Sequence, residues 1–262
     1  MSDKDGSHGA VAARLVELGR SLERESAAQV GGSFTDIEAA DALVKSDPNA
    51  FLLAVLFTQG IPAERAWAGP FLLRERLGHL DLERLASEQE AVAEAVACPP
   101  ALHRFVNTLP VWISSAASIL VDEWGGDASS LWESADISEV LERLERFPGI
   151  GRKKAAMAAE ILARHFGVPL DREGGRVAYD VQVRRVFLRS GLASDDSPRS
   201  IEEAAVRCCP EAPGLLDLPA WTIGRRWCRP SKPQCDDCPL GDVCPRFVER
   251  CPQGVGVRRG AR

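Results

Sequence analysis

Hydrophobic residues recur along this chain with the period of an α-helix and rarely with the period of a strand. Apolar positions three and four residues apart predict amphipathic helices, and strict alternation, which would predict half-buried strands, is almost absent. Alanine, leucine, glutamate and arginine dominate the sequence, which contains a single tyrosine, and these residues favour helices. We therefore expect an all-α protein, with helices over Val11–Leu22, Ile37–Lys45, Phe51–Gln59, Leu80–Ala97, Ile137–Phe147 and Val181–Leu188.

Four of the eight cysteines lie close together in the segment WCRPSKPQCDDCPLGDVC. Cys228, Cys235, Cys238 and Cys244 follow the spacing C-x6-C-x2-C-x5-C. Thiolates bind zinc or iron–sulfur clusters, but structural zinc sites usually use two short ligand pairs separated by a longer stretch. One short pair with a single cysteine on each side favours an all-cysteine [4Fe–4S] cluster, with zinc as the alternative.

The composition is that of a soluble globular protein. Of the 262 residues, 45% are hydrophobic and 27% are charged. No apolar run approaches the length of a membrane span, and the first residues have no signal-peptide pattern. We expect a cytoplasmic protein, without a membrane partner, whose thiols stay reduced. The cysteines outside the run are then free thiols or small core residues: Cys98, Cys208, Cys209 and Cys251.

Charge is distributed unevenly along the chain, although the net charge is only −6. The segment Arg143–Arg189 contains eleven Lys or Arg and five Asp or Glu, and Ala220–Arg262 contains nine and four. The remainder is strongly acidic. A basic part in an acidic protein is typical of a surface that meets a polyanion, while an ordinary solvated helix surface is the alternative.

The centre of the basic region predicts two helices joined by a tight turn. Asp136 can start the first helix, and Pro148-Gly149-Ile150-Gly151 ends it. The second helix begins near Arg152. Gly149 and Gly151 allow positive φ and leave backbone N–H groups uncovered at a positive helix N-terminus, which is a device for binding phosphate. An ordinary helix–helix connection is the alternative.

The segment FPGIGRKKAA resembles the helix–hairpin–helix of the base-excision DNA glycosylases related to endonuclease III. Two further family elements follow in the family's order. An aspartate opens a helix in Tyr179-Asp180-Val181, and the cysteine run agrees with the family's cluster loop at every gap. The resemblance covers roughly residues 51–244.

The resemblance implies a bifunctional DNA glycosylase and AP lyase that removes a damaged base from double-stranded DNA, with oxidised pyrimidine as the leading substrate class. Lys153 matches the family's catalytic lysine and Asp180 its carboxylate. A lysine nucleophile must be neutral, which a helix N-terminus and the flanking Arg152 and Lys154 favour. Lys154 is the alternative nucleophile, and phosphate binding is the alternative role for both lysines.

The resemblance also implies residues that contact DNA. Gln59 matches the family's gap-filling glutamine, and Val111, in a segment resembling the family's wedge loop, matches the apolar wedge. Core or loop roles remain equally open for these two. The full set of residues expected to contact DNA is Gln59, Val111, Gly149, Gly151, Arg152, Lys154, Arg185, Arg225 and Arg226.

The chain departs from the family at several positions near the expected site. Val181-Gln182 stand where Thr-His is usual, and LDREGGRVAY looks like an insertion before Asp180. These departures leave the excised base open: uracil or thymine in a mismatch, a modified cytosine, or adenine opposite oxidised guanine are alternatives. A non-catalytic DNA-binding or redox-sensing protein is the alternative of another class. His103 and His165 have no ligand spacing and are expected at the surface or in the hairpin.

The implied architecture has two helical lobes with a DNA cleft between them. One lobe, residues 40–175, would be a helical barrel containing the helix–hairpin–helix at about 136–166. The other, residues 10–39 with 176–262, would hold the cluster loop at 228–244, and residues 1–9 would be disordered. We expect a monomer that acts on the bacterial nucleoid.

Overall fold

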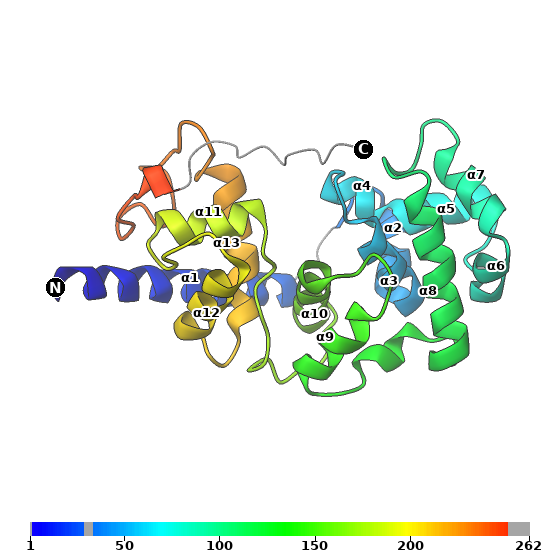
Figure 1. Ribbon diagram of the computed structural model, residues 1–262, viewed down its shortest axis with the longest axis horizontal. Helices are drawn as coiled ribbons and strands as arrows, with labels where there is room; N and C mark the ends of the chain where they lie inside the picture. The colour runs from blue at the N-terminus through cyan, green and yellow to red at the C-terminus, as the bar shows by residue number, and fades with distance from the viewer. Residues whose placement is uncertain (1, 29–33, 251–262) are drawn as a thin grey trace. The chain divides into compact units, whose positions relative to one another are not determined.

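The computed structural model of the chain describes residues 2–28 and 34–250, and these residues form helices and no strand. The all-α prediction is confirmed (Figure 1). In chain order the α-helices are α1 (Ser2–Ala28), α2 (Glu38–Ser46), α3 (Pro48–Phe57), α4 (Ala63–Trp67), α5 (Gly69–Leu77), α6 (Leu82–Ser87), α7 (Gln89–Ala97), α8 (Thr108–Trp124), α9 (Ile137–Glu145), α10 (Arg152–His165), α11 (Val181–Arg189), α12 (Pro198–Cys208) and α13 (Asp217–Arg226). Short 3-10 helices are η1 (Ala128–Trp132), η2 (Pro213–Leu216) and η3 (Val248–Arg250).

The chain divides into two compact units. One comprises Met1–Glu25 with Arg172–Arg262, and the other comprises Ser26–Asp171. None of the helices in the described residues is long and apolar enough to cross a membrane.

The start of α1 differs from the sequence prediction. Disorder was expected over residues 1–9, but α1 begins at Ser2, and only Met1 of that segment lies outside the described residues. Val11 and Leu15 of this helix are fully buried. Once a helix is anchored in this way, each added residue gains a hydrogen bond without a new nucleation cost, so the helix can extend toward the N-terminus.

The unit Ser26–Asp171 is built around α3. Every side chain from Ala50 to Phe57 is fully buried, as expected of a helix that is apolar on all sides. Asp47 caps its N-terminus by accepting hydrogen bonds from the backbone N–H groups of Asn49 and Ala50. Helices α2, α4, α5 and α8 pack around it, and the chain reaches the surface at Gln59, two residues after α3 ends.

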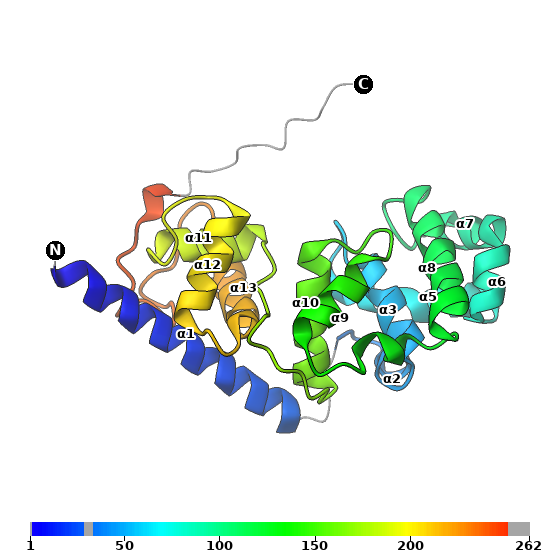
Figure 2. The same cartoon turned by 60° about the horizontal axis from the view of Figure 1, so that its bottom comes forward.

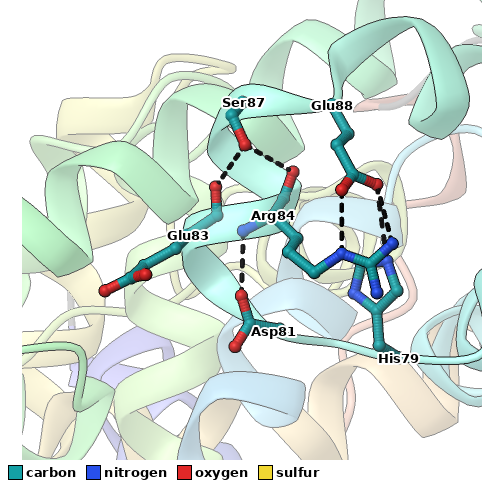
Figure 3. Close-up of polar contacts among 6 residues, drawn as sticks. All are labelled: His79, Asp81, Glu83, Arg84, Ser87 and Glu88. Carbon is teal, nitrogen blue, oxygen red and sulfur yellow. Dashed lines mark hydrogen bonds and ion pairs between the residues drawn. The ribbon is translucent and has the colours of Figure 1, made fainter.

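The predicted single helix over Leu80–Ala97 is wrong, because the structure has two helices, α6 and α7, with a break at Glu88. Figure 3 shows the polar contacts of α6. Asp81 accepts a hydrogen bond from the Arg84 N–H at its start, and Ser87 Oγ donates to the Glu83 carbonyl at its end. The Glu88 carboxylate is bound by Arg84 Nε at 2.8 Å. The bond made by Ser87 Oγ can compete with the helical backbone pattern, and α6 ends at this residue.

The other unit packs α1 beside α11, α12 and α13 (Figure 2). Its core consists of apolar side chains from these four helices and from the segments between them. Three of the loop cysteines, Cys228, Cys238 and Cys244, are half-buried against this core. The cysteine loop is therefore part of the packed structure of its unit.

Candidate nucleic-acid interface and cysteine loop

Helices α9 and α10 form the predicted hairpin. Asp136 caps α9 by accepting a hydrogen bond from the Ser138 N–H at 2.8 Å, and Leu141 and Leu144 are buried. The turn closes with a hydrogen bond from the Ile150 N–H to the Phe147 carbonyl at 2.9 Å. Four small residues give α10 a buried face that allows close packing: Ala155, Ala156, Ala158 and Ala159.

The two glycines of the turn differ in what they require. Gly149 has φ +88°, and an added Cβ would lie 2.5 Å from Cδ2 of Trp112. Gly151 has φ −100° and ψ −178°, which is extended backbone, and a Cβ there would meet open space. Both glycines were expected to allow positive φ, and only Gly149 adopts it. Its place as the exposed N-cap of α10 leaves the helix N-terminus accessible.

This difference provides a matched pair of variants. We expect Gly149→Ala to lose about 1–3 kcal/mol of unfolding free energy, from positive φ and the clash with Trp112. Gly151→Ala should lose less than about 1 kcal/mol, the cost of a poorer N-cap. Chemical denaturation of both variants measures the difference. Equal losses would contradict the close packing of Gly149 on Trp112.

Lys153 and Lys154 occupy different environments. Lys153 is exposed in the first turn of α10, beside the exposed Arg152. Lys154 is only 8% exposed, and its Nζ donates a hydrogen bond to the Leu56 carbonyl at 2.8 Å. Burial, with a smaller effect from the charge of Lys153, lowers the pKa of Lys154 to about 8. The prediction that Lys154 binds DNA is at odds with this burial.

Two further candidate DNA contacts lie on the same unit. Gln59 is exposed just after α3, where its N–H donates to the Phe57 carbonyl at 2.7 Å. Val111 is 43% exposed. It was expected in a loop, but the structure places it in the first turn of α8. Because helical geometry fixes its position relative to Trp112, the exposed valine is held on a rigid element.

Sequence reasoning missed Trp112 and misplaced His103. Trp112 lies against Gly149 and under the Lys154 ammonium group, 5.3 Å from Nζ to the ring centroid. His103 is 1% exposed rather than at the surface. Burial lowers the pKa of His103, and the positive charges of Lys154 and Arg104 add to this effect, while hydrogen bonding of the imidazole to the backbone of Gln59 and Phe57 opposes it.

Asp180 lies on the other unit, at the N-cap of α11. Its carboxylate accepts a hydrogen bond from the Gln182 N–H at 2.7 Å. Tyr179, the residue before it, donates its hydroxyl to Asp196 at 2.9 Å. Val181, the residue after it, is 56% exposed. The carboxylate is thus fixed by its own helix and flanked by the departures noted in the sequence.

Arg185 and Arg189 hold the start of the cysteine loop from α11. Arg185 is 4% exposed, and its guanidinium donates to the carbonyls of Cys228 and Gly224. The prediction that Arg185 contacts DNA is at odds with this burial. Arg189, which sequence reasoning missed, is 3% exposed and donates to the Arg229 and Pro230 carbonyls. Arg185 and Arg189 are four residues apart and so lie on one face of the helix, a spacing from which the sequence could have predicted a common partner.

All four cysteines of the run line one cavity, together with Arg189. In the described residues, no group of three or more His, Cys, Asp or Glu side chains is arranged to hold a metal ion. Burial raises the pKa of Cys238 to about 11, so its sulfur becomes a thiolate at neutral pH only when a metal replaces the proton. Four sulfurs around one cavity fit a cluster, in which several metal atoms lie between the ligands.

Exposed cations border this loop. Arg225 and Arg226 end α13 and are both exposed. Arg225 lies over the ring of Trp221 at 5.0 Å and Arg226 over that of Trp227 at 6.0 Å. The basic side chains expected to face phosphate are therefore accessible on this unit.

The chain is similar in sequence to several endonucleases III. That of Rickettsia conorii is 33% identical over 112 residues, covering 42% of this chain and 49% of that protein. That of Thermotoga maritima is 30% identical over 139 residues, covering 53% and 57%. The chain thus spans about half the length of the relatives it matches. No protein-family model matches it.

Solved structures share the fold. A non-covalent complex of endonuclease III with DNA gives a TM-score of 0.55 at 20% identity, covering 88% of this chain and 95% of that chain. A thermostable thymine-DNA glycosylase gives 0.60 at 13% identity, covering 95% and 99%. The fold is thus that of the helix–hairpin–helix glycosylases. The resemblance to endonuclease III read from the sequence is confirmed.

Proposed function

We propose that this protein is a bifunctional DNA glycosylase and AP lyase of base-excision repair. Its partner would be double-stranded DNA that contains a damaged base or an abasic site, with oxidised pyrimidine as the substrate class by resemblance. The observation that carries the proposal is the exposed Lys153 at the N-terminus of α10, within a helix–hairpin–helix, in a chain similar to endonuclease III.

Lys153 would be the nucleophile. Its neutral amine attacks the anomeric carbon of the deoxynucleotide, and the N-glycosidic bond breaks as the base leaves with the bonding electrons and accepts a proton. Ring opening gives a Schiff base between Nζ and the sugar. Loss of a proton from C2′ then expels the 3′-phosphate by β-elimination, which nicks the strand. Because Lys153 is exposed, its amine can reach a nucleotide that has left the stack.

Asp180 would stabilise the positive charge that develops on the sugar and assist proton transfer. A carboxylate suits both tasks, and the hydrogen bond from the Gln182 N–H holds it at the N-cap of α11. The N-cap role and the catalytic role use different lone pairs of the same carboxylate, so they are compatible.

Binding and distortion of DNA would use exposed groups of both units. The backbone N–H groups at Gly149 and Gly151, with the side chain of Arg152, would hold phosphate at the start of α10. Gln59 would fill the space of the extruded base, and Val111 would act as the apolar wedge. Arg225 and Arg226 would contact phosphate beside the cysteine loop.

Cys228, Cys235, Cys238 and Cys244 would hold a [4Fe–4S] cluster. The support is their spacing and the single cavity that they line. When bound, the cluster would supply a fixed cross-link of the loop and no step of the base-removal chemistry, which the lysine and the carboxylate provide.

Borohydride trapping tests the activity. The protein is incubated with duplexes that each carry an oxidised pyrimidine, mismatched uracil or thymine, a modified cytosine, adenine opposite oxidised guanine, or an abasic site. We expect a covalent adduct on the abasic duplex and, among base lesions, fastest on oxidised pyrimidine. Base release without an adduct would replace the proposal with a monofunctional glycosylase. Tight DNA binding without base release and without an adduct would indicate a non-catalytic DNA-binding protein.

A further inference from the structure

A buried lysine at position 154 is costly. Moving an ammonium group out of water is unfavourable unless polar partners replace the lost hydration. Lys154 is 8% exposed and lies directly after the exposed Lys153 on α10. A methionine of similar length would fill the same space without that cost, so the charge itself calls for an explanation.

The first partner of the ammonium group is the end of α3. Nζ donates to the Leu56 carbonyl at 2.8 Å, across 98 residues of sequence. The last carbonyls of a helix have no partner within the helix and carry a partial negative charge, so a lysine there is stabilising. Gln59 follows Leu56 by three residues. Lys154 therefore fixes the helix end from which the proposed gap-filling residue projects.

The second partner is the start of α8. Trp112 lies 5.3 Å from Nζ to its ring centroid, within the range of a cation–π interaction. The same indole packs on Gly149 so closely that a Cβ would lie 2.5 Å away. Trp112 is thus held by the turn and by α10 together. Val111, the proposed wedge, is its neighbour in the chain and projects into solvent.

We propose that Lys154 is a positioning residue for base extrusion. Its ammonium group joins the end of α3, the first turns of α8 and the hairpin, and thereby holds Gln59, Val111 and Lys153 in fixed relative positions. The proposal rests on the proposed function. It assigns Lys154 no contact with the substrate, and it distinguishes this lysine from its exposed neighbour.

The test compares Lys154→Met, which keeps the length without the charge, with Lys154→Arg, which keeps the charge. Base extrusion is followed by the fluorescence of 2-aminopurine placed next to an abasic-site analogue. We expect Lys154→Met to lose most of the fluorescence change and at least about tenfold in the single-turnover rate of base excision. Lys154→Arg should recover a large part of both, and binding to undamaged DNA should stay within about twofold in both variants.

Other outcomes are equally decisive. Wild-type extrusion and rate in Lys154→Met would overturn the proposal, and equal losses in Lys154→Met and Lys154→Arg would reduce the role to packing. Loss of the borohydride adduct in Lys154→Met with normal extrusion would make Lys154 the nucleophile instead. If the wild-type protein forms no adduct and releases no base, while extrusion still depends on Lys154, the proposed function fails and the positioning role stands.

A pH series of unfolding midpoints in denaturant shows whether the charge is buried as the structure indicates. The groups facing the ammonium are Lys153, His103, the Leu56 carbonyl and the Trp112 ring. The pKa of Lys154 falls from 10.5 to about 8 on folding. Between these values the unfolded chain keeps the proton and the folded protein has lost it, so wild-type stability rises with pH. Lys154→Met should therefore unfold at a higher midpoint below pH 8, and its advantage should vanish above about pH 10.5. If the difference between the two unfolding midpoints did not change with pH, Lys154 would not carry a buried charge.

Discussion

Lys153→Ala is expected to abolish the borohydride-trapped adduct and to lower strand cleavage by about a thousandfold or more. The amine is the group that forms the bond to the anomeric carbon, so no neighbouring residue replaces it without a change of position. The measurement is single-turnover cleavage of a duplex with an abasic site, with and without borohydride. Because Lys153 is exposed, its removal leaves no cavity, and the variant should fold as the wild-type protein does.

Arg152→Ala is the matched control for this variant. Arg152 is exposed in the same turn of α10 and carries the same charge. Its loss should weaken DNA binding, and the slope of log affinity against log salt concentration should fall by about one unit, the value for one phosphate contact. The adduct should still form. Loss of the adduct in both variants would mean that the effect of Lys153 is electrostatic. If the adduct still forms in Lys153→Ala but not in Lys154→Ala, the nucleophile is Lys154.

A nucleophilic lysine needs both a lowered pKa and access to the substrate, and these two requirements are independent of each other. A nucleophilic lysine must be deprotonated, and Lys154 has the lowered pKa, about 8. It also has to reach the substrate, and Lys154 is buried with its Nζ directed to the Leu56 carbonyl. Reaching the anomeric carbon would require breaking that bond and leaving Trp112. Lys153 is exposed in the first turn of α10, and for this reason we propose that it carries the chemistry.

The features predicted correctly from the sequence are those set by neighbours in the chain. Pro148 and Gly149 end one helix and allow the next to start, and Asp180 caps α11 as its position before an amphipathic segment predicts. Capping and helix-breaking residues act over three or four residues, so the local sequence is enough to predict where these helices begin and end.

The features that the sequence could not reveal depend on distant partners. Lys154 and Arg185 looked like surface cations in a basic region, but each is buried on carbonyl groups far along the chain, at Leu56 and Gly224. Periodicity indicates which face of a helix is apolar. It does not indicate that a carbonyl group from a distant helix end or loop will accept a hydrogen bond from a cation on that face. His103 was misplaced for the same reason, since it is buried against a distant residue, Phe57 of α3.

The second large effect is expected at the cysteine loop. Cys238→Ser should yield protein without iron and without visible colour, with much less of it soluble. One ligand of four is lost, and serine is a poor ligand for an iron–sulfur cluster. Metal-ligand binding contributes directly to folding stability, on the order of several kcal/mol. Iron content, visible absorbance and thermal unfolding measure the outcome, and zinc in place of iron would support the alternative metal.

Cys208→Ser is the matched control, because Cys208 is a half-buried thiol of the same unit outside the run. It should retain iron, colour and most of the stability, so that a loss seen only in Cys238→Ser is due to the ligand. A soluble, stable and fully active Cys238→Ser would overturn the structural role of the cluster.

The packing of the loop explains why the effect should extend beyond the loop itself. Cys228, Cys238 and Cys244 lie against the core of their unit, and Leu240 between them is 1% exposed. Arg189 of α11 donates to the carbonyls of Arg229 and Pro230. If the loop loosens, this buried guanidinium loses the acceptors that make its burial tolerable. Helix α11 begins directly after Asp180, so loss of the cluster should reduce activity as well as stability.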